Sequence, residues 1–155
     1  MKKHKIYIDL SNKKFYLLDN NDDVILSFPI IYGRNSHLGN KEKEGDQRTP
    51  RGEFYICSRN EKSKFKLFLG ISYPTEEDAK RGYDNGLINK KQRDEIINAH
   101  KHRKRPPWNT SLGGEIGIHG GGIDRDGTRG CIAMRNEDVM KLGEYVDVGD
   151  VVIMK

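Results

Sequence analysis

The stretch "GEIGIHGGGIDRDGTRGCIAM", residues 114–134, carries most of the information about this chain. It holds His119 and Cys131, one of only two cysteines, with glycines around both. Apolar runs on either side of a polar loop predict strands over 113–120 and 130–134, with the histidine at the end of the first strand. Because glycine permits turns that other residues resist, the loop is expected to bring histidine and cysteine face to face.

The pair fits a nucleophile with its base better than it fits a metal site. Zinc needs three or four ligands with close local pairing, and only Asp124 and Asp126 lie nearby. Carboxylates from a glycine loop match a thiolate metal site poorly. A cysteine attacks as its thiolate, and a neighbouring imidazole both lowers the thiol pKa and takes the proton. The sequence therefore predicts cysteine chemistry at Cys131 with His119 as base, without a metal or cofactor.

The residues before the cysteine suggest how negative charge in a reaction is stabilised. Gly130 has no side chain, so we expect it to leave room for an approaching carbonyl group. The backbone N–H groups of Arg129, Gly130 and Cys131 are then candidate donors to a developing oxyanion.

The rest of the chain predicts one β-rich domain, residues 1–155, with short helical insertions. Pro29 predicts an edge position or a bulge in its strand. Thr75 and Asp78 have the spacing of a capping box, and Asn89 and Asn136 are candidate helix N-caps. Expected strands are 5–10, 13–19, 24–33, 52–58, 66–73 and 149–155, expected helices are 74–86, 89–104 and 136–146, and 34–48 is a long polar loop.

The charge and the residue composition limit the classes of function that the chain can have. Charged residues make up 33% of the 155 residues and the net charge is +5, which fits a polyanionic partner, such as nucleic acid or an anionic cell-wall polymer, and fits an ordinary basic enzyme equally well. The basic run 100–108 is interpreted as the solvated end of a helix, because no nucleic-acid-binding motif accompanies it. Cys57, in an apolar run, is expected to be a buried hydrophobe. No signal peptide or membrane-spanning run is recognised, and we expect a monomer.

Several segments together resemble the L,D-transpeptidase catalytic domain family. "IHG" followed by "TRGCI" is similar to that family's H-G, spacer, (S/T)-x-G-C-(I/V) signature. Other matching segments cover nearly the whole chain: "IYIDLSNKKFYLL" (6–18), "TPRGEF" (49–54) and "NEDVMKLGEYVDVGDVVIM" (136–154). "PWNTSLGGEIGIHG" (107–120) and "GCIAMRNED" (130–138) are especially similar to the murein endopeptidase-like subgroup.

This resemblance implies a mainly β, sandwich-like fold and a defined reaction. Cys131 would attack the carbonyl of the third, L-centred residue of a peptidoglycan stem peptide and expel the terminal D-residue. An amine of another stem would resolve the acyl-enzyme to a 3-3 cross-link, with His119 as base and then acid. The resemblance further implies that the Gly120 carbonyl orients the histidine and that Thr128 holds the loop or ring. The expected place of action is the periplasm or cell wall.

One departure from the family pattern affects substrate binding. Many members carry arginine two residues after the cysteine, whereas this chain has Ala133, and Arg135 lies out of phase with that position. Candidate substrate-binding residues are Trp108, which could equally belong to the core, Arg135 and Asn136.

Two rival functions stay open at this point. The same site would act as an L,D-endopeptidase or carboxypeptidase if water resolved the acyl-enzyme. The chain could also be a non-catalytic wall-binding module, which its basic charge favours and its intact histidine–cysteine pair opposes.

Overall fold

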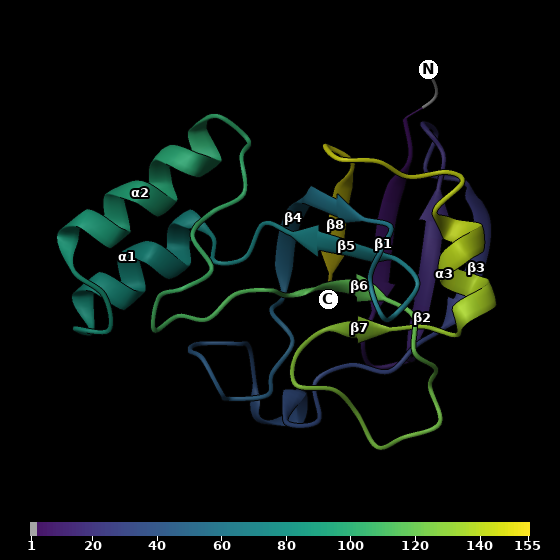
Figure 1. Ribbon diagram of the computed structural model, residues 1–155, viewed down its shortest axis with the longest axis horizontal. Helices are drawn as coiled ribbons and strands as arrows, with labels where there is room; N and C mark the ends of the chain where they lie inside the picture. The colour runs from purple at the N-terminus through teal and green to yellow at the C-terminus, as the bar shows by residue number, and fades with distance from the viewer. Residues whose placement is uncertain (1–2) are drawn as a thin grey trace.

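A computed structural model describes residues 3–155, and its central feature is one eight-stranded sheet with the order β3-β2-β1-β8-β4-β5-β6-β7 (Figure 1). The predicted mainly β class is confirmed, and the sandwich-like arrangement takes the form of a continuous sheet whose two halves share a core. The strands are β1 Lys5–Asp9, β2 Lys14–Leu18, β3 Val24–Pro29, β4 Gly52–Asn60, β5 Phe68–Ile71, β6 Gly117–His119, β7 Ile132–Ala133 and β8 Val151–Met154.

The first half of the sheet is an antiparallel meander completed by the C-terminal strand. Alternation of apolar and polar residues puts Ile6 and Ile8 of β1 into the core and their neighbours toward the surface. β2 pairs with β1 and β3, and β8 runs parallel to β1. β3 is the outer strand, so Pro29 stands at an edge as predicted, where its missing N–H leaves no ladder bond unmade.

β4 joins the two halves. Its first residues, 52–55, pair with β8, and its later residues, from Ile56 on, pair with β5, with a register irregularity between Ile56 and Ser58. β5 then pairs with β6, and β6 runs parallel to β7. The main core contains buried residues of both halves, including Phe15, Leu69 and Ile118, so the site on β6 and β7 rests on a continuous apolar support.

In the described part of the chain, three α-helices and one 3-10 helix, Ser36–Leu38, accompany the sheet. α1 (Glu76–Asp84) and α2 (Lys90–Lys101) form a hairpin beside the sheet, with a small core of their own (Figure 1). The predicted caps at Thr75 and Asn89 are present, each closed as a capping box. α3 (Asn136–Leu142) buries Val139 and Leu142 in the main core. Within residues 3–155 no helix has the length and apolarity needed to cross a membrane.

The strands that carry the site are shorter than predicted. The expected strand 113–120 is reduced to three residues and 130–134 to two. The cause is backbone geometry: Gly113, Glu115 and Gly130 have φ of 88°, 55° and 144°, outside the extended region. The residues next to the candidate nucleophile therefore belong to turns. Their side chains and carbonyl groups point in directions that a regular strand would not allow.

Candidate active site

His119 is the last residue of β6 and is held in one orientation. Its side chain is buried, and its Nδ1 lies 2.5 Å from the carbonyl oxygen of Gly120. A carbonyl oxygen only accepts, so Nδ1 carries the hydrogen and Nε2 keeps the lone pair that a base needs. A side chain at Gly120 would be 2.5 Å from the Phe65 carbonyl oxygen and 2.7 Å from Asn136 Oδ1. Glycine is therefore required where the carbonyl turns back to the ring.

Aromatic rings support the imidazole of His119. Phe65 stacks on it with ring centroids 4.4 Å apart, and Phe68, its partner across the β5–β6 ladder, lies at 6.3 Å and nearly parallel. Stacked rings restrict rotation of the imidazole and remove water from its faces. Neither phenylalanine stood out in the sequence, because apolar residues in strand-like runs give no sign of which ring they will contact.

Cys131 lies immediately before β7, next to the strand that carries the histidine. Its side chain is half-buried, and its Sγ donates to the carbonyl oxygen of Glu115 at 3.4 Å. Glu115 adopts a φ of 55°, a left-handed conformation that is unusual for a residue with a side chain. That conformation places the carbonyl acceptor beside the thiol. The contact was not foreseen, since nothing in the residue type predicts a positive φ.

The turn before the cysteine is fixed by two buried threonines. Thr128 Oγ1 donates to the Cys131 carbonyl at 2.6 Å and accepts from the Gly130 N–H at 3.0 Å. Thr49 Oγ1 donates to the Gly130 carbonyl at 2.8 Å and accepts from the Gly33 N–H. The structure thus gives Thr128 the loop-holding geometry that the family resemblance implied, and it adds Thr49, the first residue of "TPRGEF".

Gly130 has a different purpose from the one inferred from sequence. It was expected to clear space for an incoming carbonyl group, but a Cβ there would instead meet Ile116 Cδ1 at 2.9 Å and the Arg48 carbonyl oxygen at 3.1 Å. Glycine is needed for close packing against the protein and for a φ of 144°. Its N–H is already donated to Thr128, which leaves the N–H groups of Arg129 and Cys131 without an acceptor in the described part of the chain. Those two groups are the remaining candidate oxyanion donors.

Burial determines the resting charge of both reactive groups. It raises the pKa of the Cys131 thiol, against the opposing effects of the Gly117 N–H and the Lys41 ammonium. It lowers the pKa of His119, helped by the Arg125 guanidinium and opposed by the hydrogen bond to Gly120. The expectation that the imidazole lowers the thiol pKa does not hold for the resting site, because burial dominates. Both shifts favour the neutral thiol and the neutral imidazole at neutral pH, so the thiol proton has to move to His119 as the sulfur attacks.

Cys131 opens into two cavities. One, of about 540 Å³, also contains His119 and is lined by Phe65, Phe68 and Trp108; we call it the aromatic cavity. The other, of about 500 Å³, is lined by polar residues of the loop before β4 and by the turn at 113–116; we call it the loop cavity. Cys131 and Glu115 line both cavities, so open space borders Cys131 on two sides.

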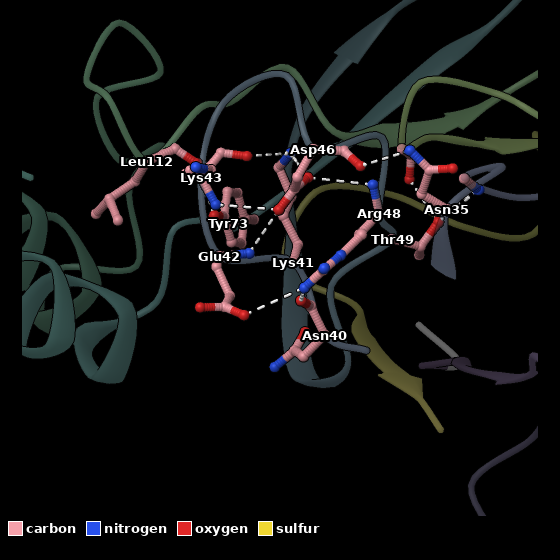
Figure 2. A network of polar contacts seen from close by, with 12 residues as sticks. Asn35, Asn40, Lys41, Glu42, Lys43, Asp46, Arg48, Thr49, Tyr73 and Leu112 are labelled. Atoms are coloured by element: carbon pink, nitrogen blue, oxygen red, sulfur yellow. Dashed lines mark hydrogen bonds and ion pairs between the residues drawn. The ribbon is translucent and has the colours of Figure 1, made fainter. Parts of the chain in front are cut away.

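A buried ion pair gives the loop cavity a fixed wall (Figure 2). Lys41 Nζ lies 2.9 Å from Asp46 Oδ1, and the two side chains are only 3% and 8% exposed. The Asp46 carboxylate also accepts from the backbone N–H groups of Glu42, Lys43 and Arg48. Burial acts to raise the pKa of Asp46, but these hydrogen bonds and Lys41 outweigh it and lower the pKa. The segment 34–48, predicted only as a long polar loop, is therefore held in shape by its own buried ion pair and hydrogen bonds.

The three candidate substrate-binding residues are placed differently. Trp108 lines the aromatic cavity and also packs edge-on against Phe68. Arg135 and Asn136 line neither cavity. Arg135 is the N-cap of α3 in place of Asn136, the predicted cap, because Asn136 Oδ1 instead accepts from the Gly121 N–H at 2.8 Å. Asn136 thereby ties the glycine loop to the helix.

Metal ligation is not supported by the arrangement of side chains. Across residues 3–155, no three His, Cys, Asp or Glu side chains gather closely enough to hold an ion together. Asp126 is 3.8 Å from Arg34, with its side chain 84% exposed, and so faces solvent rather than the histidine–cysteine pair.

Comparison with known proteins adds independent information. The sequence matches the family described as the L,D-transpeptidase catalytic domain (YkuD) over residues 3–154. Curated proteins gave no significant match.

Solved structures share the fold at low sequence identity. Pgp2, the helical cell shape determining protein of Campylobacter jejuni, has a TM-score of 0.66 and 20% identity, covering 99% of this chain and 48% of that one. Bd1075 of Bdellovibrio bacteriovorus has a TM-score of 0.63 and 20% identity, with coverage of 99% and 48%. An L,D-transpeptidase of Xylanimonas cellulosilytica has a TM-score of 0.57 and 14% identity, with coverage of 99% and 60%. The chain thus spans about half the length of the first two.

Proposed function

Because the chain belongs to the L,D-transpeptidase catalytic domain family, we propose that it is a cysteine-dependent L,D-transpeptidase acting on peptidoglycan stem peptides. The observation that supports this most is the placement in one cavity of His119, at the end of β6, and Cys131, immediately before the adjoining β7, with the imidazole nitrogen that carries no hydrogen free to act as base. A wall-binding module would need neither a histidine fixed in one tautomer nor a cysteine that borders two cavities.

The proposed first half-reaction acylates the cysteine. His119 Nε2 takes the thiol proton as the sulfur attacks the carbonyl carbon of the third stem residue. The oxyanion accepts hydrogen bonds from the N–H groups of Arg129 and Cys131. Collapse breaks the peptide bond, and the imidazolium gives its proton to the departing amine of the terminal D-residue. A thioester on Cys131 and a neutral His119 remain.

The second half-reaction transfers the acyl group. An amine of another stem attacks the thioester while His119 takes its proton, and the thiolate leaves and is then reprotonated by the imidazolium. A transferase must admit donor and acceptor to one sulfur, and the two cavities that meet at Cys131 offer that arrangement. The product is a 3-3 cross-link, or an exchanged terminal residue when a free D-amino acid is the acceptor.

Hydrolysis at the same site is the second candidate function. The position two residues after the cysteine is Ala133, fully buried in β7, so no guanidinium is available there to bind substrate as in many relatives. If the acceptor stem is held weakly, water becomes the acceptor, and the enzyme acts as an L,D-endopeptidase or carboxypeptidase.

We also propose where the reaction takes place. Peptidoglycan lies outside the cytoplasmic membrane, so the periplasm or cell wall is the proposed site of action. On the likeness to Pgp2, a helical cell shape determining protein, we propose a role in wall remodelling that affects cell shape.

Product analysis tests the proposal. The purified chain is incubated with a tetrapeptide stem, with and without an amine-bearing acceptor stem, and products are identified by mass spectrometry. The proposal predicts cross-linked dimer and free terminal D-residue, both absent with Cys131→Ala. Shortened stems alone, at any acceptor concentration, would establish the hydrolase. Product formation by the Cys131→Ala variant would exclude cysteine catalysis altogether.

A further inference from the structure

Two cations of the aromatic cavity have no neutralising partner in the part of the chain that the structure describes. Arg105 and Lys64 both line it, together with His119 and Cys131. The guanidinium of Arg105 lies 4.8 Å from the ring centre of Trp108, and the ammonium of Lys64 lies 5.1 Å from that of Phe65. Each cation therefore rests over a ring of the cavity wall and is held at its rim.

Neither cation has an ion-pair partner or a hydrogen-bond acceptor within residues 3–155. Arg59 of the same cavity is different, because it donates to Glu61 and to the carbonyl groups of Gly143 and Val146. Arg59 thus holds the fold together, while Arg105 and Lys64 keep their donors free for a ligand.

The cavity as a whole favours an anion. Its only carboxylate is Glu115, against the three cations Arg59, Lys64 and Arg105. A fourth cation, Arg125, lies nearby: its Nη2 would be 3.9 Å from a Cβ on Gly121. A cavity with low-dielectric aromatic walls and an excess of positive charge concentrates anionic groups of a substrate.

We propose that Arg105 and Lys64 bind a carboxylate of the stem peptide in the aromatic cavity and thereby set substrate preference. Arg105 is suited to this because a guanidinium presents paired N–H donors that match the two carboxylate oxygens. Stacking on Trp108 holds that group before the substrate arrives, which reduces the entropy lost on binding. The pair would supply the positive charge that β7 lacks at Ala133.

This inference rests on the proposed function for the identity of the ligand. A stem tetrapeptide has two carboxylates near the scissile bond: the terminal carboxylate of the leaving D-residue, and the side-chain carboxylate when the third residue is a diamino dicarboxylic acid. The shared chemistry is carboxylate binding, and the substrates below separate the two sources.

Binding to an inactive protein tests the inference without turnover. In a Cys131→Ala background, the dissociation constant is measured calorimetrically for three tetrapeptides: both carboxylates free, terminal carboxamide, and side-chain carboxamide. Arg105→Gln is expected to weaken binding of the free acid about tenfold, and Lys64→Gln by a smaller factor, because each removes a charge-assisted hydrogen bond. Lys101→Gln removes an equal charge from the exposed end of α2 at a residue that lines neither cavity, and it is the matched control.

The amides complete a thermodynamic cycle. Amidating the recognised carboxylate should weaken binding to the Arg105 protein by at least about tenfold, and binding to the Arg105→Gln protein only by the smaller factor that Lys64 contributes. Whichever amide shows this pattern identifies the carboxylate. Equal dissociation constants for Arg105→Gln, Lys64→Gln and Lys101→Gln would overturn the inference. Arg105-dependent binding without any turnover by the Cys131 protein would sustain the inference and reject the proposed function.

Discussion

The thiol pKa values of the two cysteines in this chain are shifted in the same direction, but the two side chains have very different surroundings. Both are free and half-buried, and burial raises the pKa of each thiol, to about 11 for Cys57. Cys57 lies within β4, where the strand passes from one half of the sheet to the other. Cys131 lies at the end of a turn, beside a histidine with a fixed tautomer and between two cavities. Thiol pKa therefore does not single out the nucleophile, whereas the neighbouring base and open space do.

The largest expected difference comes from removing each thiol in turn. Cys131→Ala should lower kcat for release of the terminal D-residue by about a thousandfold or more, because the other thiol, Cys57, lines neither cavity and so is not placed to form the thioester. Cys57→Ala should leave kcat within about twofold, since that thiol lines neither cavity. Steady-state assays on both variants give the comparison, and circular dichroism confirms that each is folded. A severe loss with Cys57→Ala and none with Cys131→Ala would reverse the assignment.

Replacing the base should make Cys131 resemble Cys57. His119→Gln is expected to lower kcat by about 10² to 10⁴, the usual contribution of a positioned general base. It should also slow alkylation of Cys131 by iodoacetamide at neutral pH toward the rate of Cys57, with the two cavities still leaving Cys131 the more accessible thiol. Peptide mapping after timed alkylation measures both rates in one sample. If the rate at Cys131 stayed unchanged in the variant, the histidine would have no role in activating the thiol.

The turn before Cys131 can be altered without touching the thiol. Gly130→Ala should destabilise the fold by about 2 to 4 kcal/mol, because it combines a left-handed φ with contacts to Ile116 and the Arg48 carbonyl. Gly122→Ala shares the positive φ but meets nothing within 4 Å, so only about 1 kcal/mol is expected. Urea unfolding of both variants gives the difference. Equal losses would show that packing beneath the turn does not constrain it.

The smallest expected effect is a shift of the acidic limb of the pH–rate profile to lower pH. Because the pKa of His119 is lowered, the imidazole stays neutral below pH 6.5, the usual value for histidine. Activity needs the neutral base, so kcat/KM should persist below pH 6.5 and fall only as pH drops through the lowered pKa. A pH–rate profile over the acidic range measures the limb. A midpoint above 6.5 would contradict a buried, neutral histidine.

The features of this molecule that depend on local sequence patterns could be predicted from the sequence. Alternating apolar residues located the strands, and capping residues located the starts of α1 and α2. The spacing of His119 and Cys131 in a glycine-rich loop, together with the family resemblance, led us to expect the two residues face to face, and both line one cavity. Each of these follows from residue type and short-range order along the chain.

The remaining features depend on contacts between distant segments. The positive φ of Glu115, the stacking of Phe65 on His119 and the burial of Lys41 against Asp46 all arise from tertiary packing. Asn136 looked like a helix cap because its type favours caps, yet the nearby Gly121 N–H offered its side chain another bond. The two cavities that border Cys131 likewise form only when segments distant in the sequence pack together.

Direct detection of the acyl-enzyme tests the central claim, that Cys131 with His119 is the nucleophile. The chain is mixed with a tetrapeptide stem, quenched in acid at short times, digested and mapped by mass spectrometry. We expect the tripeptide acyl group on Cys131 alone, with Cys57 unmodified and the adduct strongly reduced in His119→Gln. Release of the terminal D-residue without any adduct on Cys131, or with the adduct on Cys57, would contradict the account.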